Sequence, residues 1–244
     1  MSDSENIENT EVIKKKKREY KPTIPVAPYH DSDINCFEIG IDEAGRGPLF
    51  GRVYAGAVIL PKTDTFNYTL MKDSKKFSSH KKIMEAFNYI KENAVAWAIE
   101  YEDENIIDQI NILQATQSAM HKCIKKILTF NHYLNSENTS LFIDGNYFNS
   151  YTIYDQSTKK FESYKHTCVE GGDSKYASIA AASILAKVSR DEYINQLCNE
   201  NPELIERYSI DSNKGYGAKK HIDGIKEFGI SKWHRKSFGI CKNY

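Results

Sequence analysis

The sequence of 244 residues lacks any apolar run long enough to span a bilayer, and its N-terminus has no apolar signal core. It also lacks paired cysteines, because its five cysteines are widely scattered and never form a Cys-x-x-Cys arrangement. That pattern argues against a disulfide framework and against a zinc site. We therefore expect an intracellular protein with reduced cysteines, cytoplasmic, or nuclear if its host is eukaryotic.

An excess of charge of either sign is absent too, since 33 Lys and Arg balance 33 Asp and Glu. The balance is uneven along the chain, and residues 213–244 contain eight basic side chains against two acidic ones. An overall neutral protein of this kind can still present a local basic face to nucleic acid.

With 40% hydrophobic residues, the chain can bury a core, and its length fits one domain with a tail. Residues 1–33 are the expected tail, polar and acidic at first, then basic at residues 14–18, then punctuated by prolines. We expect disorder there, so that deleting residues 1–33 costs little stability. The basic run is either a phosphate-attracting or nuclear-address segment or simply solvated chain. Residues 34–244 are the expected folded domain.

The chemistry of the chain centres on residues 39–48, where two adjacent carboxylates, Asp42 and Glu43, follow an apolar run and precede Gly-Arg-Gly-Pro. Residues 37–41 predict a buried strand, and residues 51–60 predict its neighbour. Consecutive side chains of a strand point to opposite faces, so the two acids reach a common metal only if the backbone turns or bulges. A turn with solvated acids is the alternative interpretation of the spacing alone.

Apolar periodicity and turn residues predict the remaining elements. They are a helix capped by Ser78 or Ser79, a strand at residues 94–101, a helix over 104–128, a hairpin or an extended segment over 152–169 with a turn at 155–160, and a helix over 176–197. Five alanines in the last helix predict a close approach to the sheet.

Two further acids complete a candidate site. Residues 140–146 repeat the opening pattern, an apolar strand that runs into Asp144 and a glycine. Because the carboxyl ends of parallel strands gather on one edge of a sheet, Asp144 can lie beside Asp42. Asp173 follows two glycines just before a helix, where an ordinary helix cap is an equally good interpretation.

Residues 40–49, Gly-Ile-Asp-Glu-Ala-Gly-Arg-Gly-Pro-Leu, resemble the signature of ribonuclease HII, the type 2 ribonucleases H. The resemblance covers residues 37–238 and leaves the lysine-rich run outside. Other motifs similar to those of the family follow in family order at residues 111–116, 143–146, 172–175, 181–191, 214–221 and 234–238.

The resemblance implies an α/β, ribonuclease H-like fold, with a mixed central sheet flanked by helices and a short C-terminal helical segment. It implies an endoribonuclease that hydrolyses the RNA strand of RNA/DNA hybrids and cuts 5′ of ribonucleotides embedded in duplex DNA. The catalytic and metal-binding acids carried over from the family are Asp42, Glu43, Asp144 and Asp173. No membrane or protein partner follows from it, and we expect a monomer.

The same resemblance assigns substrate reading to Gly45, Arg46 and Gly47, which are similar to the family's ribose-reading loop, and to Tyr216 at the RNA-to-DNA junction. Asp191 falls in a family motif, and we interpret it as structural. Two residues depart from the family pattern: Phe50 replaces a small residue, and Arg52 stands where proline is usual. Both follow the reading loop and bear on its pose.

Four crowded carboxylates repel one another, so such a cluster is expected only where divalent cations neutralise its charge. Their hard oxygens favour Mg²⁺ or Mn²⁺ over zinc. Two ions roughly 4 Å apart suit in-line attack on phosphorus, and the resemblance specifies products with a 5′-phosphate and a 3′-hydroxyl. We interpret His221 as helix surface or packing and His234 as part of the basic segment, and place neither in catalysis.

Two alternatives remain. One is a catalytically weak hybrid-binding module of the same fold, although clustered acids are of no use to a pure phosphate binder. The other is ribonuclease HIII, which has Gly-Lys-Gly-like residues in the reading loop and a long extra N-terminal domain.

Overall fold

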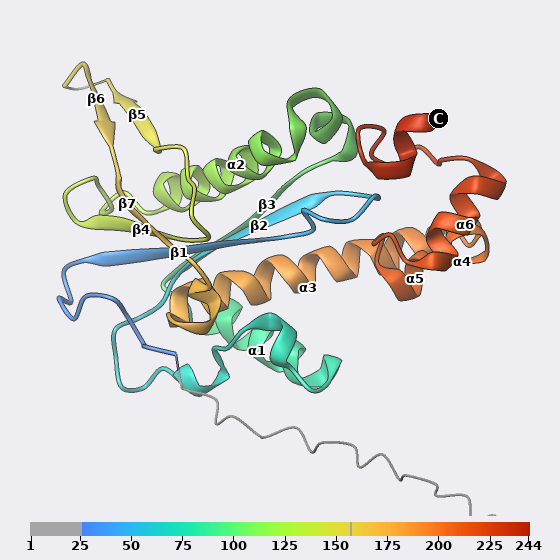
Figure 1. Cartoon of the computed structure of the whole chain (residues 1–244). Coiled ribbons are helices and arrows are strands. Elements are labelled where there is room, and N and C mark those ends of the chain that lie inside the picture. The colour runs from blue at the N-terminus through green and yellow to red at the C-terminus, as the bar shows by residue number, and fades with distance from the viewer. Residues whose placement is uncertain (1–25, 157) are drawn as a thin grey trace, which may run out of the picture.

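A five-stranded mixed sheet forms the centre of the computed structural model, which describes residues 26–156 and 158–244 (Figure 1). The strands are β1 Phe37–Ala44, β2 Val53–Ile59, β3 Ala96–Glu102, β4 Thr139–Asp144 and β7 Lys165–Val169, in the order β3-β2-β1-β4-β7. Strands β1, β4 and β7 run parallel, and β2 is antiparallel to both of its neighbours. The predicted mixed sheet is therefore confirmed.

Helices cover both faces of this sheet (Figure 1). Helix α2, Glu104–Phe130, packs on one face, while α3, Ala177–Glu200, packs on the other with α1, His80–Asn93, against it. Every residue of β2 is buried, as expected for a strand that is covered on both sides. Ser79 Oγ accepts a hydrogen bond from the Lys82 amide at 3.4 Å, so Ser79 is the predicted cap of α1.

Small residues bring α3 close to the sheet. A methyl group added to Gly40 would lie 2.2 Å from the carbonyl carbon of Ser178, and one added to Gly56 would lie 2.4 Å from the carbonyl oxygen of Ala182. Only glycine fits at these two positions, and the alanines of α3 complete the contact. The predicted close approach is confirmed, and it fixes the position of α3 relative to β1.

Helix α2 differs from its prediction by a break near its start. Asn111 has a φ of 66° inside the helix, and its Oδ1 accepts hydrogen bonds from the amides of Leu113 and Gln114 at 3.0 and 3.1 Å. Asn111 therefore caps a second helical segment, a local side-chain bond that periodicity does not reveal.

The remaining described elements lie beyond the sheet. The predicted hairpin is present as β5, Thr152–Asp155, and β6, Lys160–Ser163. A C-terminal helical segment comprises α4 Glu203–Tyr208, α5 Ile210–Asn213, α6 Lys219–Phe228 and a 3-10 turn at Gly239–Asn243. Its apolar side chains form a core of their own with the end of α3 and with Phe50 of the β1–β2 loop. This segment therefore packs directly against the loop that follows the acids.

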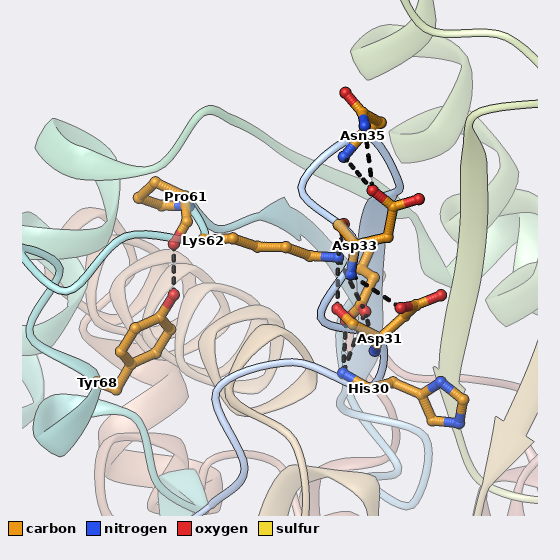
Figure 2. Close-up of polar contacts among 8 residues, drawn as sticks. His30, Asp31, Asp33, Asn35, Pro61, Lys62 and Tyr68 are labelled. Carbon is orange, nitrogen blue, oxygen red and sulfur yellow. Dashed lines mark hydrogen bonds and ion pairs between the residues drawn. The ribbon is translucent and has the colours of Figure 1, made fainter.

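Part of the expected tail is attached to the domain, because residues between 26 and 33 form hydrogen bonds with it although residues 28–33 are exposed. Ala27 forms a parallel bridge with Tyr176, and the buried Glu38 carboxylate accepts hydrogen bonds from the amides of His30 and Asp31 at 2.6–3.1 Å. Lys62 Nζ donates to the carbonyl oxygens of Asp31 and Asp33 at 2.7 and 2.9 Å (Figure 2). The expected tail, residues 1–33, therefore contains eight residues that belong to the domain. Its basic run lies outside the described residues.

None of the helices in the described residues is long and apolar enough to cross a bilayer. All five cysteines are free thiols, as expected from their scatter.

Candidate active site

Strand β1 carries the first two acids without a break in its pairing. Asp42 pairs with Gly56 and Glu43 with Ala55 in one-to-one register, so the bulge or turn that would let the two acids share one metal ion does not occur. The two side chains consequently take opposite faces. Asp42 is buried on the α3 side within hydrogen-bond reach of Ser183, whereas Glu43 points to the α2 side.

Asp144 lies between these two acids at the end of β4. Strands β1 and β4 are parallel with Ile41 opposite Ile143, so Asp144 emerges beside Asp42 at the same edge of the sheet. Asp144 Oδ1 accepts a hydrogen bond from the Gly172 amide at 2.7 Å, which ties the strand end to the loop that carries Asp173. The predicted gathering of carboxyl ends is thus what brings residues a hundred positions apart together.

Asp173 reaches the cavity from a 3-10 turn, Gly172–Ser174, which follows Gly171 in the left-handed conformation. Helix α3 begins after Tyr176 and has no side-chain cap, so Asp173 does not serve as its cap. The capping interpretation is wrong for this residue.

The four acids line one cavity of about 570 Å³ together with a set of polar and basic side chains from distant segments. Sequence reasoning did not assign most of that set: Ser74, Lys75, Ser183, Lys187, Arg190 and Lys214. Asp191, interpreted as structural, also lines the cavity, where it is ion-paired with Lys187. The lining mixes acids with cations, as expected of a site for an anionic substrate and its metal ions.

Burial raises the pKa values of Asp42, Glu43 and Asp173, and neighbouring carboxylates add to this effect. Burial, then the charges of Glu43 and Asp144, hold the pKa of Asp42 well above its ordinary value. Burial also raises the pKa of Glu43 against the opposing effect of Arg46, whose Nη1 lies 3.3 Å from Glu43 Oε1. Burial, then Asp73 and Asp144, raise the pKa of Asp173. A divalent cation would remove this repulsion.

The donor chemistry fits Mg²⁺ or Mn²⁺, because all four side chains offer carboxylate oxygens. The acids do not form a closed cage as they stand: within residues 26–156 and 158–244, no group of three or more His, Cys, Asp or Glu is gathered tightly enough to hold an ion.

The loop after β1 is held from behind by two buried arginines. Arg235 donates hydrogen bonds to the carbonyl oxygens of Gly45, Arg46, Pro48 and Gly51 at 2.6–3.0 Å. Its side chain is fully buried, and burial followed by repulsion from Arg190 lowers its pKa to about 9.

Arg190 of α3 adds a second set of bonds, to the carbonyl oxygens of Phe50, Arg52 and Lys214 at 3.1–3.2 Å. A methyl group on Gly45, whose φ is 95°, would lie 2.2 Å from Arg190 Nε, so only glycine fits there. Both arginines lie within the family-like motifs, but the sequence indicates no role for them, because carbonyl partners this far away in the sequence leave no local pattern.

Tyr216 lies beside this loop. A methyl group on Gly47 would lie 3.5 Å from Cε1 of Tyr216, and the tyrosine side chain is 52% exposed toward the cavity that it lines. The structure therefore places Gly45, Arg46, Gly47 and Tyr216 together on the wall of the cavity that the acids line.

The two departures from the family pattern face away from the cavity. Phe50 is fully buried against the rings of Trp233 and His234. The Arg52 guanidinium lies over the rings of Tyr101 and Tyr193, 4.0 and 4.3 Å from their centroids. Neither Phe50 nor Arg52 is among the residues that line the cavity. Both side chains pack behind the loop that follows the acids.

The two histidines also lie outside that lining. His221 is buried rather than at a helix surface, and His234 is buried as well. Of the two interpretations of His221, helix surface and packing, the structure confirms packing.

The sheet order, the flanking helices and the acids at the sheet edge define a ribonuclease H-like protein. The ribonuclease HII of a PCNA complex from Archaeoglobus fulgidus superposes with a TM-score of 0.61 at 21% identity, covering 84% of this chain and 96% of that chain. Bst-RNase HIII in complex with Mn²⁺ gives a TM-score of 0.56 at 16% identity, covering 79% and 70%. These similarities show a shared fold.

Sequence comparison is more specific. The family model described as Ribonuclease HII matches residues 39–241. A ribonuclease HII of Phocaeicola vulgatus is 42% identical over 213 residues, or 87% of this chain and 93% of the relative, and one of Bacteroides fragilis is 43% identical over 203 residues, or 83% and 89%. The chain therefore belongs to the ribonuclease HII family, which consists of metal-dependent endoribonucleases.

Proposed function

We propose that this protein hydrolyses the RNA strand of RNA/DNA hybrids and cuts 5′ of single ribonucleotides embedded in duplex DNA, leaving a 5′-phosphate and a 3′-hydroxyl. We further propose that Asp42, Glu43, Asp144 and Asp173 hold two Mg²⁺ or Mn²⁺ ions during the reaction. The observation that carries this proposal is the shared cavity, in which the four acids and the loop beside Tyr216 face the same space.

Different side chains of the cavity bind the phosphates and the metal ions. Lys75, Lys187 and Lys214 bring positive charge to the cavity wall, where they can contact phosphates of the nucleic acid. The four acids would hold the divalent ions, which would supply activation of a water and stabilisation of the leaving 3′ oxygen. The Glu43 amide donates to Oδ1 of Asp42 at 2.7 Å and the Gly172 amide donates to Oδ1 of Asp144 at 2.7 Å, and these bonds orient both carboxylates.

In this proposal, the loop of Gly45, Arg46 and Gly47 and the side chain of Tyr216 recognise the sugar. The 2′-hydroxyl is the group that distinguishes RNA from DNA at a single position, and it can both donate and accept hydrogen bonds. Backbone groups of Gly45 and Gly47 can approach it closely because no side chain intervenes. The exposed ring of Tyr216, beside Gly47, can pack on the neighbouring deoxyribose.

An end-labelled DNA duplex that contains one ribonucleotide tests the proposal. Incubation with Mg²⁺ or Mn²⁺ should produce one cut, 5′ of the ribonucleotide, and the labelled fragment should carry a 3′-hydroxyl. An all-DNA duplex of the same sequence is the control and should remain intact. Retention of the duplex by the protein without any cutting, in either metal, would favour the hybrid-binding alternative.

A further inference from the structure

Two buried histidines of the C-terminal segment lie next to the backbone of Tyr216. His221, on α6, and His234, in the segment that follows, are 0% and 1% exposed. Their Nε2 atoms are 3.0 Å apart, and Nδ1 of His221 lies 2.8 Å from the carbonyl oxygen of Tyr216. Neither ring lines the active-site cavity, so any part they take in the reaction is indirect.

The partners of the two rings fix where their protons lie. The Ser231 amide donates to Nδ1 of His234 at 2.9 Å, and a ring nitrogen that accepts a hydrogen bond carries no proton. The proton of a neutral His234 is therefore on Nε2, which donates to Nε2 of His221. The proton of His221 is then on Nδ1, which donates to the Tyr216 carbonyl. One directed chain of hydrogen bonds thus runs from Ser231 to Tyr216.

This chain of hydrogen bonds requires both rings to be neutral, because a second proton on either ring would place two N–H groups face to face. Burial lowers the pKa of His221, and burial together with the charge of His221 lowers the pKa of His234 to about 3. The other titratable ring that packs on the pair is Tyr208, whose centroid lies 4.9 Å from that of His234. The environment therefore favours the neutral pair.

Tyr216 depends on its backbone for its position. Its ring is half exposed and its neighbours in the sequence are both glycines, which leave the backbone unusually free. Its carbonyl oxygen accepts from His221 and from the Ala218 amide at 2.7 Å. The Tyr216 amide also donates to the carbonyl oxygen of Asn213 at 3.0 Å, so the anchor at the Tyr216 carbonyl is one of the contacts that fix where the ring stands relative to Gly47.

We propose that His221 and His234 are positioning residues for Tyr216, holding its carbonyl through the directed hydrogen-bond chain so that its ring stays beside Gly47. This inference rests on the proposed reading role of Tyr216. Substrates that need the tyrosine most, those with a single ribonucleotide, should then depend most on the pair.

Two substitutions at position 221 separate positioning from bulk stability. His221→Leu removes the donor to Tyr216, and it should reduce cleavage at a lone ribonucleotide about tenfold more than cleavage of a continuous hybrid. His221→Asn places an amide nitrogen near the former Nδ1 and should restore most of that selective loss. Equal losses on both substrates, or no rescue by asparagine, would overturn the proposal.

Tyr216→Ala distinguishes a failure of this inference from a failure of the proposed function. If Tyr216→Ala leaves both substrates unaffected, the reading role itself is wrong. If Tyr216→Ala is selective, then adding His221→Leu to it should cause no further selective loss, because the positioned ring is already gone. Additive selective losses would mean that the histidines act independently of Tyr216.

Nitrogen NMR of the unmodified protein gives a readout that does not depend on the variants folding. The ring proton should reside on Nδ1 in His221 and on Nε2 in His234, and both rings should titrate below the ordinary pKa of histidine. The opposite tautomers, or protonation of either ring at the ordinary pKa of histidine, would contradict the hydrogen-bond chain.

Discussion

The acid cluster and the reading loop lie side by side but are held in different ways. Asp42, Glu43 and Asp144 are placed by strand pairing, so their positions follow from the register of β1 with β2 and β4. The loop that begins at Gly45 is placed by side chains from far along the chain, above all by Arg235, 190 residues away in sequence. The difference teaches that strand pairing positions these acids, whereas docking of the C-terminal segment positions the loop beside them.

The largest effect should come from the sheet side of this comparison. Asp144→Asn removes a ligand charge without changing volume, so it should abolish metal-dependent cleavage while hybrid binding and thermal stability persist. Asp64→Asn, an exposed change outside the cavity lining, is the matched control. Undiminished cleavage by the Asp144 variant would rule out its assignment as a metal ligand.

Removing the loop's main support should have the next largest effect. Arg235→Leu leaves four buried carbonyl oxygens without their donor, which should lower the free energy of unfolding by about 3 kcal/mol or more. Denaturant titration measures this loss, with the exposed neighbour Lys236→Ala as the control. An unchanged unfolding midpoint for Arg235→Leu would show that the loop stands without the clamp.

A change on the reading side alone should be selective. Tyr216→Ala should reduce cleavage at a lone ribonucleotide by about 1–3 kcal/mol in activation free energy, the range for one lost stacking contact, with a smaller effect on a continuous hybrid. Tyr216→Phe keeps the ring and serves as the control. Rates measured on both substrates decide the point, and parallel losses would make Tyr216 a general binding residue.

The N-terminal boundary predicts a smaller effect. Deleting residues 1–33 removes the amides that satisfy the buried Glu38 carboxylate, so the melting temperature should fall by about 2–8 °C. Deleting residues 1–25 leaves these contacts in place and should cost little. Equal melting temperatures for the two truncated proteins would restore the original expectation of an unpacked tail up to residue 33.

The acids should also carry a small stability cost without metal. The pKa of Asp42 is raised in the folded protein. Ionisation of Asp42 therefore destabilises the folded state once the pH rises above 3.8, the ordinary pKa of the carboxyl group. Metal-free Asp42→Asn should therefore be more stable than the parent at pH 7, with the difference vanishing as the pH falls toward 4. Thermal unfolding in a chelator across this range measures it, and a difference that grows at low pH would contradict the burial argument.

Much of the acid cluster could be predicted from the sequence. Apolar runs that end in Asp42 and Asp144 predict strand ends, and parallel strands bring such ends together. The continuous register through Glu43 was not predictable, because glycines allow a bulge without requiring one.

What the sequence alone determined is the set of elements, the acids and the family resemblance, because strand and helix periods and short motifs are local properties. The tertiary structure alone decided how the reading loop is held. Arg190 and Arg235 act through backbone carbonyls of distant segments, and such bonds do not depend on the identity of the partner's side chain. For that physical reason they leave no trace in the local sequence of the loop they support.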